Sequence, residues 1–572
     1  MEKKNDLIQI STPRKTAQVR LTDGRILEGP VGTPLEAFVA AIAQSDQPPI
    51  VAALVDGELR ELTWPITKDV DVQLLSNATS DGHRIYQRSL TLLMLAAVRE
   101  LFPHAHITVD HSVTMTGLLC EVDGPPPFTP ERVAQIEALM REIVDQDERI
   151  VKREVPLEEA AALFKARGYE DKVSLLEYRR KNYVVLYSLR QEQDYFYGYM
   201  VPSAGYLRTF DLIPHPPGFI LRAPRWSAPM ELPPSHDSPK LDLIFRQYGQ
   251  WLRTLDIGDV STLNKAIRTG HMQEVVLVSE ALHEQQVVNI AAQIADRPEV
   301  RLVLIAGPSS SGKTTFSKRL AVQLIVRGLR PVPLEMDNYF VDRPLTPRDE
   351  KGEYDFEHLH ALDLDLFNEN LADLMAGKKI QLPRYSFRTG TRERGETLQI
   401  SSDHIIIAEG IHGMNPDLVA GIPPQRIYRS YISALTQLNI DRHNRIPTTD
   451  TRLLRRIVRD AQCRGYSAAE TIQRWESVRR GETRWIFPYQ ENADSMFNSA
   501  LVYELSVLKP FVEPLLRHVE PNTLAYVECK RLLAFLQWFL PCPPDLIPGN
   551  SILREFIGGS FFHSSPSNCA AR

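Results

Sequence analysis

The sequence has few cysteines, no long apolar run and no excess of positive charge. Its five cysteines are scattered and include no Cys-x-x-Cys pair (Cys120, Cys463, Cys529, Cys542 and Cys569). The pattern therefore indicates neither a disulfide framework nor a zinc knuckle. No stretch of about eighteen apolar residues occurs, and the N-terminus does not lead into the apolar core of a signal peptide. We expect a soluble cytoplasmic protein that does not contact a membrane.

The net charge is −6 at pH 7 and the isoelectric point is near 6.2, which argues against a basic protein that coats nucleic acid. Hydrophobic residues make up 43% and charged residues 24% of the 572 residues, as in ordinary globular proteins. A chain of this length is too long for a single core, so we expect about three or four domains.

The most informative stretch is Gly-Pro-Ser-Ser-Ser-Gly-Lys-Thr-Thr at 307–315. An apolar run at 301–306 predicts a buried parallel strand before it, and a helical pattern begins near Thr315 and ends near Arg327. The stretch therefore matches the phosphate-binding pattern Gly-x4-Gly-Lys-[Ser/Thr] in its strand-turn-helix setting. The alternative is a glycine- and serine-rich turn without a ligand.

In such a loop the backbone amides surround a phosphate, and glycines keep side chains out of the way. Lys313 would place its charge at the β- and γ-phosphates, and Thr314 would offer its hydroxyl to Mg²⁺. The predicted nucleotide contacts of the loop are Gly307, Ser309, Ser310, Ser311, Gly312, Lys313, Thr314 and Thr315.

Two carboxylates follow predicted strands further along the chain. Asp337 follows a strand expected at 331–336, and Glu409 follows one expected at 404–408. The carboxyl ends of parallel strands border the crevice in which open α/β sheets bind ligands. Asp337 is therefore a candidate to accept the proton of an attacking hydroxyl or to hold Mg²⁺, and Glu409 is the second candidate Mg²⁺ carboxylate. The structural alternative for Asp337 is a turn cap.

A helix predicted to start near Asp450 carries Arg452, Arg456 and Arg459 at positions i, i+4 and i+7, which lie on one face. Three guanidinium groups in this arrangement favour a clamp on a triphosphate. A solvated face of ion pairs is the alternative. Arg464 is expected to continue the same lid.

Residues 17–29 alternate as two strands joined by Asp23-Gly24, a strong hairpin signal. A helical stretch at 34–43 and strands at 50–55 and 70–75 follow. With the Leu-Thr-Asp-Gly-Arg entry at 21–25, this order resembles the TGS domain, a ubiquitin-like fold at the front of threonyl-tRNA synthetases. We assign residues 16–77 to such a β-grasp domain and expect it to serve as a docking module. Contact with RNA or another ligand is the alternative.

Residues 80–275 form the next predicted domain. Its first helix, at 86–102, is similar to the helix of the threonyl-tRNA synthetase editing domain that carries a His-Ser-x-x-His motif. Ser89 is retained, but Arg88 and Leu92 replace the two histidines. Because neither side chain ligates a metal, we expect no editing or zinc site of that type. Three histidines downstream lack an accompanying acidic or cysteine ligand and are interpreted as ordinary residues: His104, His106 and His111.

An aromatic segment at 195–207 and a proline-rich segment at 214–239 follow in the same domain. The aromatic residues predict either a pocket for a planar ligand or the core of a β-rich layer. The prolines are interleaved with Phe219, Ile220, Leu221 and Trp226, which favours a covering loop or an interdomain strap over a disordered linker.

The rear half resembles the uridine kinase and phosphoribulokinase family. Besides the phosphate-binding loop it has Asp-Asn-Tyr-Phe at 337–340, Tyr-Asp-Phe-Glu-His at 354–358, Pro-Arg-Tyr-Ser-Phe at 383–387 and Ile-Ala-Glu-Gly at 407–410, in the family's order. The resemblance implies a phosphotransferase that uses ATP and Mg²⁺ and an alcohol acceptor. The implied fold class is α/β, with a P-loop kinase of parallel sheet and flanking helices at 276–520. The β-grasp domain and an α+β synthetase-like domain precede it, and a helical extension and tail follow at 521–572.

The resemblance also implies roles for single residues. Asp337 would be the general base on a nucleoside 5′-hydroxyl, and Thr314 with Glu409 would complete the Mg²⁺ shell. Glu357 takes the place of an aspartate that binds the ribose hydroxyls. The remaining assignments are Lys313 and Arg456 to catalysis, Asp337 also to the metal, Arg459 and Arg464 to ATP, and Tyr385 and Tyr339 to the substrate.

Two departures bear on the substrate. Gly390 stands near the position at which uridine kinases have a histidine that contacts the pyrimidine. Tyr466 stands at the position at which they have an arginine of the nucleoside site. The expected acceptor is a nucleoside or a related ribose-bearing small molecule. The alternatives are a phosphoribulokinase-like sugar phosphate kinase and a nucleotide-gated protein that binds RNA. No Asn-Lys-x-Asp motif follows the loop, which counts against a GTPase switch. A homo-oligomer is left open.

Overall fold

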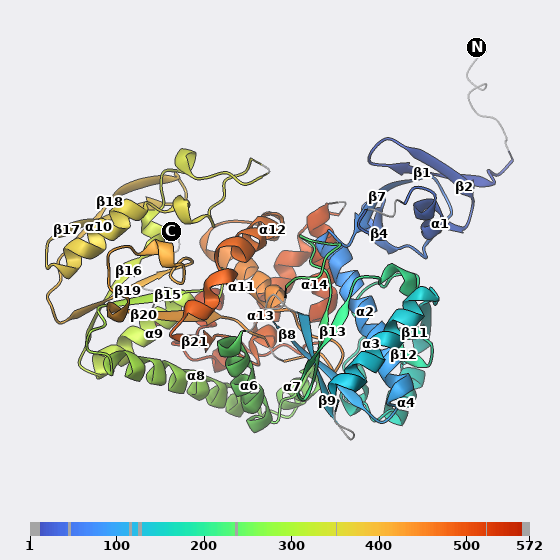
Figure 1. Cartoon of the computed structure of the whole chain (residues 1–572), viewed down its shortest axis with the longest axis horizontal. Helices are drawn as coiled ribbons and strands as arrows, with labels where there is room; N and C mark the ends of the chain where they lie inside the picture. Colours follow the sequence, from blue (N-terminus) through green and yellow to red (C-terminus); the bar gives the residue numbers. More distant parts are fainter. Residues whose placement is uncertain are drawn as a thin grey trace, which may run out of the picture.

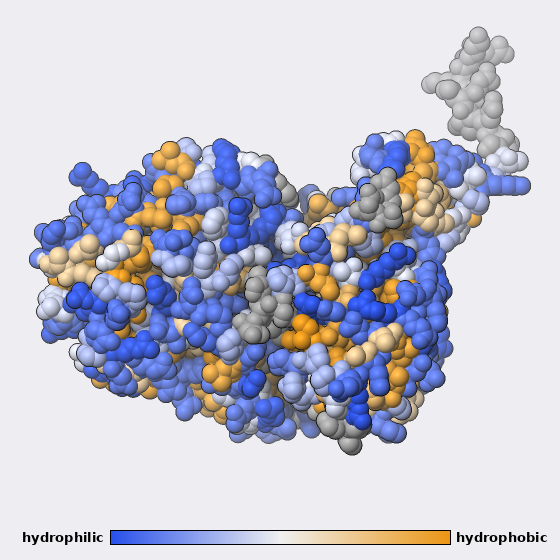
Figure 2. All heavy atoms as spheres, viewed as in Figure 1, coloured by the Kyte–Doolittle hydropathy of each residue, from blue (hydrophilic) through white to orange (hydrophobic). Residues whose placement is uncertain are grey.

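A computed structural model describes residues 12–562, except 44–46, 114–116, 124–127, 235–237, 351, 437 and 522. Residues 563–572, at the end of the predicted C-terminal tail, therefore lie outside the described residues. The N-terminal module projects at one end of the molecule, and the parallel sheet of the rear half lies towards the other (Figure 1). None of the described helices is both long enough and apolar enough to cross a membrane, and the face seen in Figure 2 is mostly hydrophilic.

The N-terminal module is a five-stranded sheet in the order β2-β1-β7-β4-β5. The predicted hairpin is confirmed, because β1 and β2 run antiparallel and Gly24 in their turn has a φ of +89°, which glycine adopts without strain. β1 and β7 are parallel. The elements are β1 Thr16–Leu21, β2 Ile26–Pro30, α1 Leu35–Ala40, β4 Ile50–Val55, β5 Glu58–Glu61 and β7 Val70–Ser76.

The second part is built around α2 (Ser80–Leu101), whose first turn is capped by the Thr79 side chain. All residues of α2 from Ser89 to Val98 are buried, so this helix is a core element and not a surface helix. Helix α3 (Pro130–Asp145) packs beside it. Two antiparallel sheets contain β8 His106–Val113, β9 Gly117–Asp123, β13 Asp211–His215 and β14 Gly218–Arg222, and β10 Val151–Pro156, β11 Tyr183–Leu189 and β12 Glu192–Asp194.

The proline-rich segment differs from its prediction. Its first part forms the antiparallel strands β13 and β14, and Phe219 and Leu221 are buried in the core of the second part. Pro214 is tolerated because β13 is the edge strand of its sheet, where the missing amide costs no ladder hydrogen bond. Only the later prolines form the loop that leads to α6 (Pro239–Thr254).

The rear half contains a five-stranded sheet in the order β16-β19-β15-β20-β21, in which every neighbouring pair is parallel. Alternate residues of the central strand face two cores: Val303 and Ile305 pack with α9 (Lys313–Val326), whereas Leu302 and Leu304 pack with α10 (Leu364–Met375). The predicted α/β class with a parallel sheet is confirmed. Its strands are β15 Leu302–Ala306, β16 Arg330–Glu335, β19 His404–Gly410, β20 Ile427–Ser433 and β21 Ser495–Asn498.

After the sheet the chain returns towards the front half. Helices α13 (Glu504–Arg517) and α14 (Leu524–Leu536) pack with α11 (Thr448–Cys463) and α12 (Ala468–Trp485). Val527 of α14 is buried in the core of the second part. Helix α8 (Met272–Ala295) precedes β15 and packs on α9. The domain boundaries at 77, 275 and 520 stay predictions.

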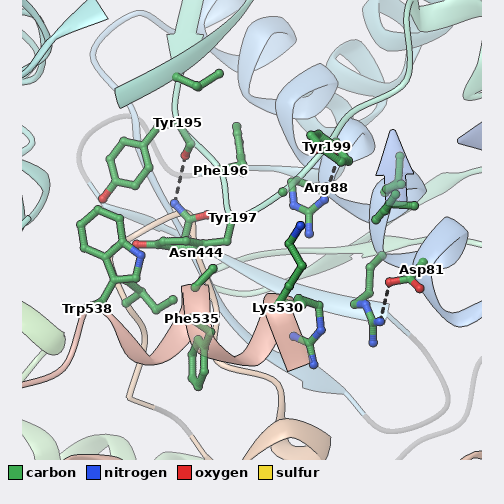
Figure 3. A pocket seen from close by; sticks show the side chains of 18 of the residues that line it. Asp81, Arg88, Tyr195, Phe196, Tyr197, Tyr199, Asn444, Lys530, Phe535 and Trp538 are labelled. Carbon is green, nitrogen blue, oxygen red and sulfur yellow. Dashed lines mark hydrogen bonds and ion pairs between the residues drawn. The ribbon is translucent and has the colours of Figure 1, made fainter. Parts of the chain in front are cut away.

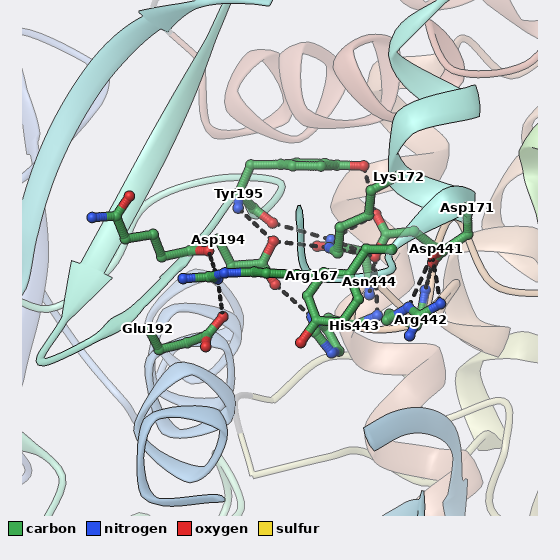
Figure 4. A network of polar contacts seen from close by, with 12 residues as sticks. Arg167, Asp171, Lys172, Glu192, Asp194, Tyr195, Asp441, Arg442, His443 and Asn444 are labelled. Carbon is green, nitrogen blue, oxygen red and sulfur yellow. Dashed lines mark hydrogen bonds and ion pairs between the residues drawn. The ribbon is translucent and has the colours of Figure 1, made fainter. Parts of the chain in front are cut away.

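A buried network of charges joins the front and rear halves (Figure 4). Lys172 in α5 (Glu170–Leu176) is completely buried, and its Nζ lies 2.9 Å from Asp194 and 2.8 Å from Asp441. His443 contacts Asp194, and the Tyr195 hydroxyl donates to Asp441 at 2.7 Å. Burial by itself raises the pKa of Asp194, but Lys172 and His443 outweigh it and lower that pKa to about 2. Asp194 is therefore ionised at neutral pH.

We expect Lys172→Met to lower the free energy of unfolding by about 3–5 kcal/mol, because it leaves two buried carboxylates without their cation. Trp538 stacks on Tyr195 with ring centroids 5.8 Å apart, so tryptophan fluorescence during urea unfolding at pH 7 reports on this region. The exposed Lys165→Met in α4 (Leu157–Ala166) is the matched control. Equal unfolding midpoints for the two variants would contradict this prediction.

Candidate active site

The loop at 307–312 links β15 to α9 at the carboxyl end of the central strand, as the sequence predicts. Gly312 has a φ of +85° at the N-cap of α9, and Ser310 has a φ of +59°. A β-carbon on Gly307 would come 1.9 Å from the carbonyl oxygen of Ile432. Both glycines are therefore required, one for its backbone conformation and one for its close approach to β20.

The loop presents groups that an anion would satisfy. The amides of Gly312, Lys313 and Thr314 donate to no described residue, and the buried Oγ atoms of Ser310 and Ser311 likewise have no hydrogen-bond partner in the described part of the chain. These donors lie at the N-terminus of a 14-residue helix, which carries a partial positive charge. The set fits the phosphates of a nucleotide.

Lys313 and two carboxylates lie beside these amides. The Nζ of Lys313 donates to the carbonyls of Gly307 and Pro308 at 2.9 and 3.1 Å. Burial lowers the pKa of Lys313, while the carboxylates of Glu409 and Asp337 act in the opposite direction. The Thr314 hydroxyl donates to Glu409 at 2.9 Å. Burial raises the pKa of Glu409 to about 7, with a further contribution from Asp337.

These contacts bring together the three predicted metal ligands, Thr314, Glu409 and Asp337. A hydroxyl and two carboxylates fit Mg²⁺, which proteins bind with one or two carboxylates and the phosphates of a substrate. Among the described residues, no group of three or more His, Cys, Asp or Glu side chains forms a metal site by itself. Of the three histidines of the front half, His111 stacks on Phe245 with ring centroids 3.7 Å apart.

The arginines of α11 divide into two groups. Arg452 is buried, donates to the Ser309 carbonyl at 2.9 Å and pairs with Glu482 of α12. The predicted clamp of three arginines is therefore corrected. Arg452 is engaged by the Ser309 carbonyl and by Glu482, so it supports the loop and is not available to a ligand. Arg456 donates to the Ser309 hydroxyl at 3.0 Å, so it lies at the loop as predicted.

Asp460 gathers the remaining arginines. It lies 3.2 Å from Arg456, 3.3 Å from Arg459 and 3.4 Å from Arg464. Repulsion from Arg459, together with burial, lowers the pKa of Arg464 to about 10. Three cations on one carboxylate leave a positive excess beside the loop, which favours an anionic ligand.

Two supports of the loop escaped the sequence analysis. Arg455 is completely buried, pairs with Glu504 and donates to the carbonyls of Ser310 and Ser499. Glu482 accepts from the Ser309 amide at 2.9 Å. Arg455 is visible in the sequence only as one more arginine of the helix, and no local signal connects it to Glu504.

The C-terminal segment also reaches the loop. Glu555 in α15 (Arg554–Ile557) accepts from the amide and the hydroxyl of Thr315 at 3.1 and 2.9 Å. A β-carbon on Gly312 would come 2.5 Å from Ile552. The predicted nucleotide contact Thr315 is therefore occupied by a carboxylate of the chain itself.

The predicted acceptor side lies beyond the ends of β16 and β19. Asp337 is exposed in the turn Met336–Tyr339 that follows β16. Glu357 lies close enough to Arg456 to interact electrostatically; burial raises the Glu357 pKa to about 7, while Arg456 opposes the shift. Tyr385 is buried beside Phe340, with ring centroids 5.5 Å apart. These side chains surround the same end of the sheet.

Tyr339 does not share this position. It is completely buried, and its hydroxyl accepts from Asn370 of α10 at 3.1 Å. This packing supports the turn that carries Asp337 and leaves no surface for a substrate, so we revise the assignment of Tyr339 to a core residue.

The two sequence departures have structural consequences. Arg343 lies against Gly390, where a β-carbon would come 2.7 Å from its Nε, and it donates to the Phe387 carbonyl. The Tyr466 ring lies 4.4 Å from the guanidinium carbon of Arg474. An arginine therefore stands near the position at which the family has a histidine.

Residues 302–506 match the family model of the Phosphoribulokinase / Uridine kinase family. This part of the rear half is thus similar to that family. A "Possible Uridine Kinase from Bacillus stearothermophilus" is 20% identical and covers 35% of this chain and 89% of its own, with a TM-score of 0.25. The D-glycerate 3-kinase from Cryptococcus neoformans is 16% identical and covers 48% of this chain and 87% of its own, with a TM-score of 0.19.

The N-terminal region is similar to threonine–tRNA ligases. That of Symbiobacterium thermophilum is 35% identical over 196 residues, which are 34% of this chain and 30% of the ligase. That of Geobacter sp. (strain M21) is 32% identical over 194 residues, with the same shares. The chain thus spans about 30% of the length of these relatives. Both predicted resemblances are confirmed.

We expect Glu555→Gln to bind ATP about fivefold more tightly than the parent protein. The substitution replaces a charged hydrogen bond to Thr315 by a neutral one, a loss of about 1 kcal/mol for the competing contact. Calorimetric titration with ATP and Mg²⁺, without acceptor, measures the change. Glu520→Gln, at an exposed position outside the site, is the control. An unchanged or weaker affinity of Glu555→Gln would refute competition by this carboxylate.

Proposed function

We propose that this protein is an ATP- and Mg²⁺-dependent kinase that phosphorylates a primary hydroxyl of a nucleoside or a related ribose-bearing small molecule. The observation that carries the proposal is the loop itself, with three amides that lack an acceptor among the described residues, beside Lys313 and the carboxylates of Glu409 and Asp337. The family match of residues 302–506 supports a kinase of nucleoside or sugar type.

The residues of the loop would bind the phosphates. Gly307 and Gly312 permit the approach, the amides of 312–314 and the hydroxyls of Ser310 and Ser311 would donate to phosphate oxygens, and Lys313 would add its charge. Arg456, Arg459 and Arg464 would stabilise charge on the transferred group, because phosphoryl transfer depends mainly on positioning and electrostatics. Thr314, Glu409 and Asp337 would hold Mg²⁺, which neutralises phosphate charge when bound.

On the acceptor side, Asp337 would take the proton of the attacking hydroxyl. Glu357 and Tyr385 would orient the acceptor at the same end of the sheet. The contact of Arg343 with Gly390 favours a second candidate, an acceptor that itself carries a phosphate, as in a sugar phosphate kinase. A nucleotide-gated protein that binds RNA through its N-terminal region is the alternative of a different class.

We expect Asp337→Asn to lower acceptor-dependent ATP turnover by about a hundredfold or more, because the amide cannot serve as a general base. The assay measures ADP release with Mg²⁺ over a panel of nucleosides, ribose sugars and sugar phosphates. Asp365→Asn, at an exposed position in α10, is the matched control. ATP binding without turnover on any acceptor would refute the kinase proposal for this panel and favour the RNA-binding alternative.

The pH dependence tests Glu357. Because burial raises its pKa to about 7, its carboxyl is protonated at pH 6 and ionised at pH 8, where it accepts hydrogen bonds from two hydroxyls more strongly. We expect the KM for the acceptor to fall as the pH rises through about 7, at saturating ATP and Mg²⁺, which keep Glu409 ionised. In Glu357→Gln this dependence should disappear, whereas Glu353→Gln, at an exposed position, should keep it. A parallel profile in all three proteins would exclude Glu357 from acceptor binding.

A further inference from the structure

A cavity of about 520 Å³ lies between the front half and helix α14, and none of the predicted kinase-site residues lines it. Its walls come from the N-terminal module, helix α2, the strands β8 to β11 with residues 179–181, the segment at 195–199, and the rear-half residues 440–450 and 526–538. Figure 3 shows Arg88, the aromatic side chains of 195–199 and the α14 residues Lys530 and Phe535 around this space. A volume of this size holds a small-molecule ligand.

The charge of the cavity is one-sided. Of the described residues that line it, ten are Lys or Arg and three are Asp or Glu, although the protein as a whole has a net charge of −6. Some of the cations have partners: Arg531 pairs with Asp450 at 2.6 Å, and Lys152 pairs with Glu61 at 2.8 Å. The excess positive charge of the cavity therefore lies on the cations that have no such partner.

Four of the lining arginines form no ion pair with a carboxylate among the described residues: Arg88, Arg179, Arg445 and the exposed Arg180. Arg88 donates only to the Tyr199 carbonyl, at 2.6 Å, and Arg179 only to the Tyr183 carbonyl, at 2.6 Å. The Nε of Arg445 has no hydrogen-bond partner in the described structure. Burial lowers the pKa of Arg88 and of Arg445 to about 10. Asp450 and Asp110 act on Arg445, and Asp81 acts on Arg88, but none of them forms an ion pair with either arginine among the described residues. The lost hydration of these guanidinium groups is therefore only partly compensated, and a bound anion would offset the remaining cost.

The backbone around Gly198 leaves space for the guanidinium group of Arg88. The guanidinium lies against Gly198, where a β-carbon would come 3.0 Å from Nη1, and Gly198 has a φ of +121°. Arg88 also stands where the synthetase editing helix has a histidine. The residue therefore brings a permanent cation into the cavity from the front half, while Arg445 brings one from the rear half.

Aromatic rings line the same space. Trp538 stacks on Tyr195 with an interplanar angle of 17°, and the guanidinium carbon of Arg179 lies 5.1 Å from the centre of the Trp538 ring. Tyr197 and Tyr199 are only half-buried, and Lys152 lies 5.2 Å above the Tyr199 ring. Flat apolar faces beside arginines favour a ligand with both a planar ring and negative charge.

We propose that this cavity binds a nucleoside 5′-phosphate, with its phosphate on Arg88 and Arg445 and its base against the aromatic residues. Inorganic phosphate would satisfy the arginines but not the rings, and a free nucleoside would satisfy the rings but not the arginines. The cavity takes walls from both halves of the chain, so the site exists only in the complete protein. This proposal does not rest on the proposed kinase reaction.

The test uses the full chain with Lys313→Ala, which weakens nucleotide binding at the loop and leaves the cavity unchanged. Calorimetric titration with AMP, GMP, UMP, adenosine and inorganic phosphate measures binding, and the cavity variants below assign it to the cavity. We expect at least one of the three nucleotides to bind at least tenfold more tightly than both adenosine and inorganic phosphate. Adding Arg88→Met or, separately, Arg445→Met should weaken that binding about ten- to a hundredfold.

Arg253→Met, at an exposed position in α6 outside the cavity, is the control and should bind like the parent. Circular dichroism and the melting temperature establish that each variant is folded, and having two arginine variants keeps the test valid if one of them unfolds. Equal affinity in the folded arginine variants would overturn the proposal. Absence of saturation by all three nucleotides up to millimolar concentration would also overturn it, even if tRNA bound instead.

Discussion

Lys172 lies in the interior between Asp194 of the front half and Asp441 of the rear half. Three buried ions cost several kcal/mol each in lost hydration, so the arrangement persists only if every charge is satisfied. Asp441 is satisfied by Lys172, by the Tyr195 hydroxyl and by the amides of His443 and Asn444. The front half thereby fixes the rear-half residues 441–444. The next residue, Arg445, enters the cavity, and α11 begins three residues later.

Helix α11 transmits this constraint to the phosphate-binding loop. Its two inner arginines are struts, because Arg452 holds the Ser309 carbonyl and Arg455 holds the Ser310 carbonyl. The partners Glu482 and Glu504 neutralise these buried cations from α12 and α13. Arg456 and Arg459, the outer arginines of α11, are therefore not needed to pair with Glu482 and Glu504 and remain for an anion. A single helix thus separates a structural set of cations from a set that remains for a ligand.

The features that could be predicted from the sequence are those set by residues that are neighbours in the chain. The glycine spacing of the loop, the apolar strand before it and the Asp23-Gly24 hairpin each depend on a few neighbouring residues, and all three appear in the structure. The helical period also placed Arg452, Arg456 and Arg459 on one face of α11, spread over about two turns. It could not show which of them point inward, because that depends on Glu482 and Glu504, which lie far along the chain. The same reason explains Tyr339, whose burial is set by Asn370 of α10.

The C-terminal segment connects the loop with the cavity. Lys530, Phe535 and Trp538 line the cavity, and the same segment continues to Ile552 and Glu555, which contact Gly312 and Thr315. An anion that binds at the loop competes with Glu555 for Thr315, and an anion in the cavity contacts the beginning of the same segment. If occupancy of one site displaces this segment, the affinity of the other site must change, and thermodynamic linkage requires the change to be equal in both directions. The condition for such coupling is that the segment has two conformations whose equilibrium both ligands bias.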